Sequence, residues 1–418
     1  MPALASIGGL DAFSGLTLRP HPGAAVATAQ DSLAGAARAI GRCSALRRLD
    51  LRIELSDKLA DRISATFWQY LAEARALERL RLAIRSSTAG TNASHLITGL
   101  AGLLRLRTLA LRLDNVFEDA TLPACVSRLV QLTSLSLSGL RGLRCTPGWA
   151  RLPALVCLDF NSCDFECDGE EALPGLDALG SLTSLELRNC NGLHMLPTSL
   201  WRLTQLRCLA HCLWDEAPRC ELPVSRPPAC ASACAASLTH LSLIGYNMTT
   251  WPACVLAATR LAHLDLSCSC FEQLPEGVSV LTALKMLYLG RHSEGDMQIG
   301  GALDARALRH LSCFPALHEL SFANCSVLFS PSFQAAATHP RLERLELNTS
   351  YLACGPSCQA FLCFAIALLQ QGRPDVLCSW TRAVKGVGQQ DAQRFRGALQ
   401  AVGFAHYNDF DYEPLELE

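Results

Sequence analysis

Residues 261–289 read LAHLDLSCSCFEQLPEGVSVLTALKMLYL and contain two copies of the pattern Leu-x-x-Leu-x-Leu, which start at Leu261 and Leu284. Within each copy, leucines alternate with other residues, as they do in a short strand that has one buried face. A Leu-Pro pair lies between the copies, where the chain returns to begin the next strand. One copy cannot bury its leucines alone, so the stretch predicts strands that stack on one another.

The same pattern occurs twelve times, with Phe at the last place in two copies and His211 there in one. The first leucines of the copies are Leu46, Leu77, Leu106, Leu132, Leu155, Leu182, Leu206, Leu238, Leu261, Leu284, Leu317 and Leu342. The step between copies ranges from 23 residues, as from Leu261 to Leu284, to 33 residues, from Leu284 to Leu317. The pattern therefore predicts a parallel sheet with one strand per copy, because each strand buries its leucines against those of its neighbours.

The Leu-Pro copies, such as residues 261–289 and 195–209 (MLPTSLWRLTQLRCL), resemble the repeats of intracellular leucine-rich-repeat proteins. Repeats of this form occur in Ras-group scaffolds and in the repeat regions of plant disease-resistance proteins. The resemblance covers about residues 106–347. It implies an α/β fold, a leucine-rich-repeat solenoid shaped as a curved horseshoe, with a parallel β-sheet on the concave face and helices and irregular loops on the convex face.

The spacing of the copies divides the chain into four parts. Residues 1–45 are expected to form an N-terminal half-repeat, with a strand over 15–18 and a capping helix over 31–41. The array of about twelve repeats spans 46–352, with a helical return between 56 and 76 and loop insertions near 211–237 and 290–301. A C-terminal cap with helices over 357–371 and 391–402 and a strand over 375–380 is expected within 353–407, and an acidic tail over 408–418.

The chain contains 21 cysteines, an odd number without the regular spacing of a disulfide framework. The ninth position of the leucine pattern is usually Asn or Cys, whose side chain bonds the backbone of the loop inside the coil. Cys163, Cys190 and Cys325 fall at this position, which Ser269 and Tyr246 occupy in other copies. We therefore interpret the cysteines mainly as small buried side chains.

The sequence has no Gly-x4-Gly-Lys-Ser/Thr, His-Glu-x-x-His or Gly-x-Ser-x-Gly motif, so we expect neither an enzyme nor a cofactor. Cys208, His240 and His263 hold the same motif position in three consecutive copies, and Asp265 lies beside them. A structural zinc ion needs four well-placed ligands, and the usual Cys-x-x-Cys pairs are missing. No metal site is predicted.

The residues between the leucines of each strand point away from the core and would line the concave face. In the first three copies these positions are mostly basic, with Asp50 as the one acid. From the fifth copy on they are acidic, aromatic, or flexible and apolar. The expected partner-binding residues are Arg48, Arg52, Arg79, Arg81, Arg112, Asp159, Glu186, Asp265, Tyr288, Glu319 and Glu346. This pattern would orient a partner with the opposite polarity.

We predict a scaffold or adaptor that binds a protein or peptide on the concave sheet. A formal net charge of −2 argues against nucleic acid as the partner. A substrate-receptor subunit of a ubiquitin ligase and an immune or signalling sensor of the disease-resistance type are alternatives, but an adaptor-binding helical module before Leu46 and a nucleotide-binding domain are not found. Without a secretory signal pattern or an apolar run long enough to span a membrane, the expected location is the cytoplasm, or else the cytoskeleton or ciliary axoneme.

Overall fold

The computed structural model describes residues 12–18, 26–55, 65–86, 100, 102–114, 121–122, 126–145, 151–166, 173–193, 196–213, 231–246, 248, 250–269, 271, 274–290, 303–304, 311–322, 327–328, 338–347, 363, 366–368, 370–371, 377–380 and 397. These residues belong to two units, Met1–Leu213 and Trp214–Glu418. No helix within them has both the length and the apolar composition that crossing a bilayer requires.

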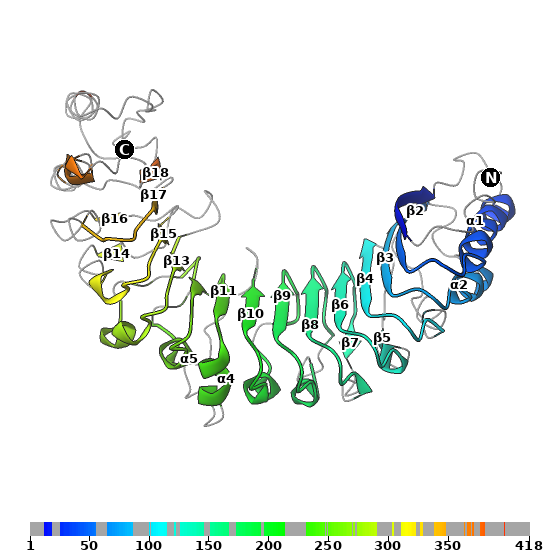
Figure 1. Cartoon of the computed structure of the whole chain (residues 1–418), viewed down its shortest axis with the longest axis horizontal. Helices are drawn as coiled ribbons and strands as arrows, with labels where there is room; N and C mark the ends of the chain where they lie inside the picture. Colours follow the sequence, from blue (N-terminus) through cyan, green and yellow to red (C-terminus); the bar gives the residue numbers. More distant parts are fainter. Residues whose placement is uncertain are drawn as a thin grey trace, which may run out of the picture. The chain divides into compact units, whose positions relative to one another are not determined.

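The first unit is built on a parallel sheet whose eight strands follow one another in chain order (Figure 1). They are β1 (Ala12–Leu18), β2 (Arg48–Leu55), β3 (Arg79–Ser86), β4 (Thr108–Asp114), β6 (Ser134–Ser138), β8 (Cys157–Asn161), β9 (Ser184–Arg188) and β10 (Cys208–Cys212). A separate parallel pair joins β5 (Thr121–Leu122) to β7 (Arg144–Cys145) in the loops. The register is the one that the leucine pattern predicts, because equivalent leucines such as Leu49, Leu80 and Leu109 lie opposite one another.

The second unit repeats the arrangement with six parallel strands in chain order. They are β11 (His240–Ile244), β12 (His263–Asp265), β13 (Met286–Tyr288), β15 (Glu319–Ser321), β17 (Arg344–Leu347) and β18 (Leu377–Trp380). A short pair joins β14 (Leu303–Asp304) to β16 (Val327–Leu328). Leu241, Leu264 and Leu287 again lie opposite one another.

The core of both units consists of the repeated leucines. The first leucine of all twelve copies has an exposed fraction of 0%. Full burial of a leucine contributes roughly 1.5–3 kcal/mol relative to leaving it exposed. Burial on this scale, repeated in every copy, holds successive strands in register and leaves only the residues between the leucines facing outward.

The return segments are helical and lie on the side of the leucine core away from the sheet (Figure 1). In the first unit they are α1 (Val26–Gly41), α2 (Ala65–Ala72) and the 3₁₀ helices η2 (Val126–Arg128), η4 (Leu176–Ala178) and η5 (Thr198–Arg202). In the second they are α4 (Ala231–Ser237), α5 (Ala253–Ala257) and the 3₁₀ helix η6 (Glu276–Val280). Three of these helices directly follow a proline that has an extended backbone: Pro197, Pro252 and Pro275. Each of these prolines follows an apolar residue and begins the return segment.

Several predicted elements occur with shifted ends. The helix expected over 31–41 starts at Val26, and the strands expected over 15–18 and 375–380 run from Ala12 to Leu18 and from Leu377 to Trp380. The insertion predicted near 211–237 is shorter at both ends, because β10 includes its first two residues and α4 its last seven. Residues 291–301 and nearly all of the predicted cap helices and acidic tail lie outside the described residues.

At position nine of the pattern, Cys163 and Cys190 bond the backbone as expected, whereas the buried Ser269 hydroxyl has no hydrogen-bond partner among the described residues. The buried Cys163 thiol donates to the carbonyl oxygens of Leu137 and Asn161, at 3.4 and 3.5 Å. The Cys190 thiol does the same one repeat later, to Phe160 and Arg188, at 3.6 and 3.3 Å. Each thiol thus joins its own loop to the preceding strand. Cys325 lies outside the described residues.

The residue before position nine has a left-handed backbone in five copies. These residues are Gly139 (φ 77°), Ser162 (φ 52°), Asn189 (φ 56°), Gly245 (φ 84°) and Cys268 (φ 62°). Their N–H groups donate to carbonyl oxygens of the next copy, on Asn161, Arg188, Cys212, Ser267 and Gly290, at 2.7–3.1 Å. Gly and Asn adopt this conformation readily, whereas Ser162 and Cys268 are held in it by the surrounding loops.

Gly192 provides a test of how closely the loops stack. Its φ is +74°, and a Cβ placed on it would lie 2.1 Å from the carbonyl oxygen of Phe165 in the preceding loop. We expect Gly192→Ala to lower the free energy of unfolding by at least about 2 kcal/mol, because the left-handed backbone and the close approach both disfavour a side chain. Gly180→Ala, with nothing within 4 Å of the added atom, should change it little. Equal urea midpoints for the two variants would contradict this prediction.

Candidate functional site

The outward face of each sheet is the surface on which the sequence places the partner-binding residues. Because strand side chains alternate, the residues between buried leucines form columns that run across the strands. In the first unit the first column contains Arg48, Arg79, Thr108, Ser134, Cys157, Ser184 and Cys208. The second contains Asp50, Arg81, Ala110, Ser136, Asp159, Glu186 and Ala210. The third contains Arg52, Ala83, Arg112, Ser138, Asn161, Arg188 and Cys212.

The structure brings the predicted arginines together on β2, β3 and β4. Arg48 lies opposite Arg79, and Arg81 lies opposite Asp50. Arg52 and Arg112 share a column with Ala83 between them. Among the described residues, Arg48, Arg52, Arg79 and Arg81 form no hydrogen bond or ion pair, and all four side chains are exposed. We call these four residues the basic columns.

Of the acidic residues predicted on β8 and β9, Glu186 is paired with a neighbouring cation, whereas one oxygen of Asp159 is buried without a hydrogen-bond partner among the described residues. Asp159 accepts a hydrogen bond from the Ser136 hydroxyl at 2.8 Å. Glu186 forms an ion pair with Arg188 at 2.5 Å. Sequence reasoning missed Arg188 as a partner because it stands in a different column of the same strand. The Glu186 position therefore presents less negative charge than the sequence suggested.

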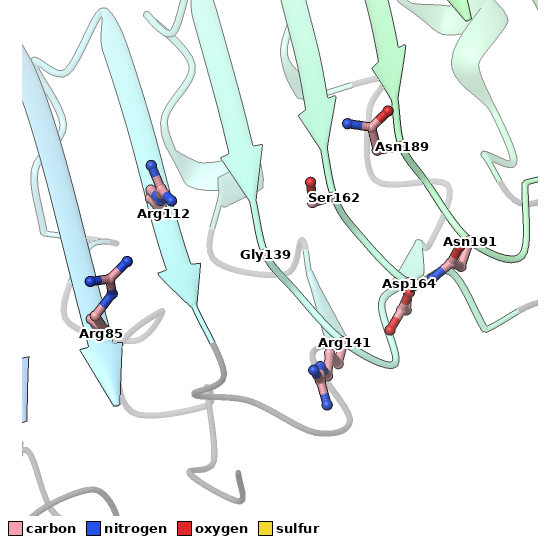
Figure 2. A pocket seen from close by; sticks show the side chains of 8 residues that line it. All are labelled: Arg85, Arg112, Gly139, Arg141, Ser162, Asp164, Asn189 and Asn191. Atoms are coloured by element: carbon pink, nitrogen blue, oxygen red, sulfur yellow. Dashed lines mark hydrogen bonds between the residues drawn. The ribbon is translucent and has the colours of Figure 1, made fainter. Parts of the chain in front are cut away.

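A cavity of about 450 Å³ opens at the carboxyl ends of the strands in the first unit (Figure 2). It is lined by Arg85, Arg112, Gly139, Arg141, Ser162, Asp164, Asn189 and Asn191. Gly139, which follows β6, is the one lining residue without a side chain, so it leaves this part of the cavity unfilled. Of the lining residues only Arg112 was predicted, since the others belong to loops or to the end of β3.

The outward face of the second unit has a different chemistry. Its first column contains His240, His263, Met286, Glu319 and Arg344, and its second contains Ser242, Asp265, Tyr288, Ser321 and Glu346. The rings of His240 and His263 stack with centroids 5.7 Å apart, and Tyr288 lies against His263 at 5.3 Å. Glu319 pairs with Arg344 at 3.4 Å. The predicted Asp265, Tyr288 and Glu319 thus lie in one aromatic and acidic cluster, with Glu346 beyond Ser321.

Partial burial shifts the acid–base properties of this cluster. Desolvation lowers the pKa of His263, and the charge of Asp265 opposes that change. Desolvation, together with the charge and hydrogen bond of Glu319, raises the pKa of Tyr288 to about 12. Both rings are therefore neutral near pH 7 and present aromatic faces rather than charge.

The row of Cys208, His240 and His263 is divided between the units. Cys208 belongs to the first unit, and burial raises the pKa of its thiol. His240 and His263 are neighbours in the second unit. Among the described residues there is no group of three or more His, Cys, Asp or Glu side chains that could hold a metal ion. None of the twelve cysteines whose side chains the structure describes forms a disulfide, and six of them are buried.

Comparison with known proteins identifies the fold. No family model matches the sequence, and no curated protein matches it. The structure is similar to an internalin from Listeria monocytogenes, with a TM-score of 0.52, 16% identity and coverage of 83% of each chain. A leucine-rich-repeat protein of Leptospira interrogans matches with a TM-score of 0.48 and 18% identity, over 90% of this chain and 91% of the other. A plant peptide hormone receptor, RGFR1 in complex with RGF2, matches with a TM-score of 0.35 and 14% identity, over 83% and 60%.

The lowered pKa of His263 makes the stability of the fold depend on pH in a measurable way. Because the folded state binds this proton less readily than the unfolded chain, its contribution to stability is fully present above about pH 6.5 and is lost as the pH falls toward the folded pKa. Urea unfolding at pH 7 and pH 5 should show a smaller decrease for His263→Gln than for the wild type. NMR titration should place the His263 midpoint below about 6.5, and a midpoint above that value would contradict the assignment.

Proposed function

We propose that this chain, which has the fold of a leucine-rich-repeat solenoid, is a protein-binding scaffold that holds an acidic segment of its partner on the outward face of β2, β3 and β4. The observation that carries the proposal is the set of basic columns, in which Arg48, Arg52, Arg79 and Arg81 are exposed and form no ion pair among the described residues. A partner that carries carboxylates would complete these interactions.

The arrangement favours binding for two physical reasons. Neighbouring strands stand roughly 4.8 Å apart, so arginines on adjacent strands repel one another, and a bound anionic chain removes that repulsion. The backbone beneath them is held by the leucine ladder, so little ordering is needed when the partner binds. The exposed charges also increase the rate at which an oppositely charged partner associates.

A protein partner fits this surface better than a nucleic acid does. The outward positions of β2, β3 and β4 that lie in the three columns are Arg, Asp, Ala and Thr, with no aromatic ring on which a base could stack. The net charge of the chain is −2, whereas proteins that bind nucleic acid through the phosphate backbone usually carry a basic excess. A short acidic segment needs only the local positive charge that the basic columns supply.

The second unit offers a further contact region of a different kind. Tyr288 and Met286 are of residue types enriched in interfaces, and His263 lies between them and His240. Asp265 and Glu319 lie at its border. We propose that this aromatic and acidic cluster binds a separate, less acidic part of the partner.

The proposal predicts that charge reversal on β3 abolishes binding. A photo-crosslinking amino acid at Ala110, which lies beside Arg81 in the second column, should form one main adduct in the source cell. Arg79→Glu combined with Arg81→Glu should reduce this adduct at least tenfold, because attraction for the acidic segment becomes repulsion.

The matched control is Arg128→Glu combined with Arg151→Glu. Both arginines are exposed on return segments, and the pair changes the net charge by the same amount. Adduct yield should stay near the wild-type level, provided that thermal unfolding shows all variants to be folded. An adduct that persists in the Arg79/Arg81 variant would overturn the assignment of this face.

A further inference from the structure

We infer that the cavity lined by Arg85, Arg112 and Arg141 is an anion site that receives a phosphate group carried on a side chain of the bound partner. The inference rests on the proposed function for the source of that group, although the phosphate chemistry of the cavity stands by itself. Three guanidinium groups line the cavity, against one carboxylate, that of Asp164.

The fold brings the cationic side of the cavity together from neighbouring strands. Arg85 lies near the end of β3, and Arg112 lies on β4. The register pairs Arg85 with Asp114 and Arg112 with Ala83, so the two arginines are diagonal neighbours on one face. Figure 2 shows them on one side of the cavity, with Arg141 and Gly139 between them and the residues of the opposite side.

The opposite side consists of loop residues with polar side chains. Ser162 and Asn189 are held at left-handed turns, where their N–H groups bond the next copy. The Asn189 side-chain oxygen is buried from solvent and has no hydrogen-bond partner among the described residues. Asn191 donates its amide to the Asp164 carboxylate at 2.5 Å, which partly satisfies the one acid of the cavity. The Ser162 hydroxyl donates to the Asn161 side-chain oxygen at 3.2 Å. The remaining neutral donors are N–H groups of the Asn189 and Asn191 amides, which can add to the guanidinium donors around an anion.

Phosphate suits this cavity better than a carboxylate does. A phosphate monoester carries about −1.5 to −2 charge and three acceptor oxygens, which can engage several guanidinium forks at once. A carboxylate carries one charge and two oxygens. The volume of about 450 Å³ is ample for a phosphate with its attached side chain. None of the lining residues is aromatic, so the cavity offers no stacking surface for a nucleotide base.

The position of the cavity links it to the partner face. Arg112 lines the cavity and also belongs to the third column, two strands from Arg52. A peptide held on the basic columns would therefore reach the cavity within the width of neighbouring strands. Two acidic residues lie opposite Arg85 in the sheet, Glu54 on β2 and Asp114 on β4.

Isothermal titration of the full chain tests the inference with three probes: inorganic phosphate, the peptide acetyl-Gly-phosphoSer-Gly-amide and its unphosphorylated form. We expect the phosphopeptide to bind at least tenfold more tightly than inorganic phosphate and the unphosphorylated peptide to show no binding. Arg85→Gln combined with Arg112→Gln should lower phosphopeptide affinity at least tenfold, and Arg128→Gln combined with Arg151→Gln should leave it within twofold.

Arg141→Gln, a single change in a loop, serves as a second variant if the double variant fails to fold, and it should lower affinity severalfold. Arg112→Lys keeps the charge but loses the planar fork, so it should restore only part of the affinity.

Absence of phosphopeptide binding, or equal binding by the cavity and control variants, would overturn the inference. Equal affinity for inorganic phosphate and phosphopeptide would overturn the partner's side chain as the source. A result in which the phosphopeptide does not bind but the crosslink at Ala110 still forms would contradict only the anion site. The proposed partner face and the anion site can therefore be tested separately.

Discussion

The structure depends on one interaction, the burial of each copy's leucines against the leucines of neighbouring strands. The first leucine is fully buried in every copy, and the equivalent leucines of neighbouring strands lie opposite one another throughout each unit. A slip by one residue would move all of these side chains to the solvent face, so the register is strongly specified. Because the register is specified, the residues between the leucines form straight columns, and the leucine pattern determines which positions lie opposite one another on neighbouring strands.

A second constraint acts at the carboxyl end of each strand. The left-handed residue at Gly139, Ser162 and Asn189 turns the chain out of the sheet and donates its N–H to the next copy. Position nine then directs a thiol back to the preceding strand, as Cys163 and Cys190 do. Together these bonds stack the loops as regularly as the strands. The cavity lies among these turns, because the left-handed residues Gly139, Ser162 and Asn189 all line it.

The fold and the positions of the basic columns could be predicted from the sequence because they follow from a period of two within each strand and one strand per copy. Arg48 and Arg79 are neighbours for that reason alone. The compensation of Glu186 by Arg188, and of Glu319 by Arg344, could not be predicted, because it depends on the rotamers of long side chains. The cavity was missed because most of its residues follow the strands, where chain direction is set by left-handed turns rather than by the leucine pattern. The shorter insertion before α4 was missed because an Ala-Cys stretch carries no leucine signal.

The two sites that we propose in the first unit would have different roles in recognition. Exposed arginines in the basic columns are screened by solvent and salt, so each contributes little affinity but all attract an acidic partner over about a Debye length. In the cavity, guanidinium groups and neutral donors line a single hollow, where charge-assisted hydrogen bonds are stronger and depend on geometry. Under these proposals, the strands would supply the attraction for the partner and the loops the discrimination between partners. A leucine ladder with a regular register supports both, because it holds the columns and the loop residues at fixed distances from one another before the partner arrives.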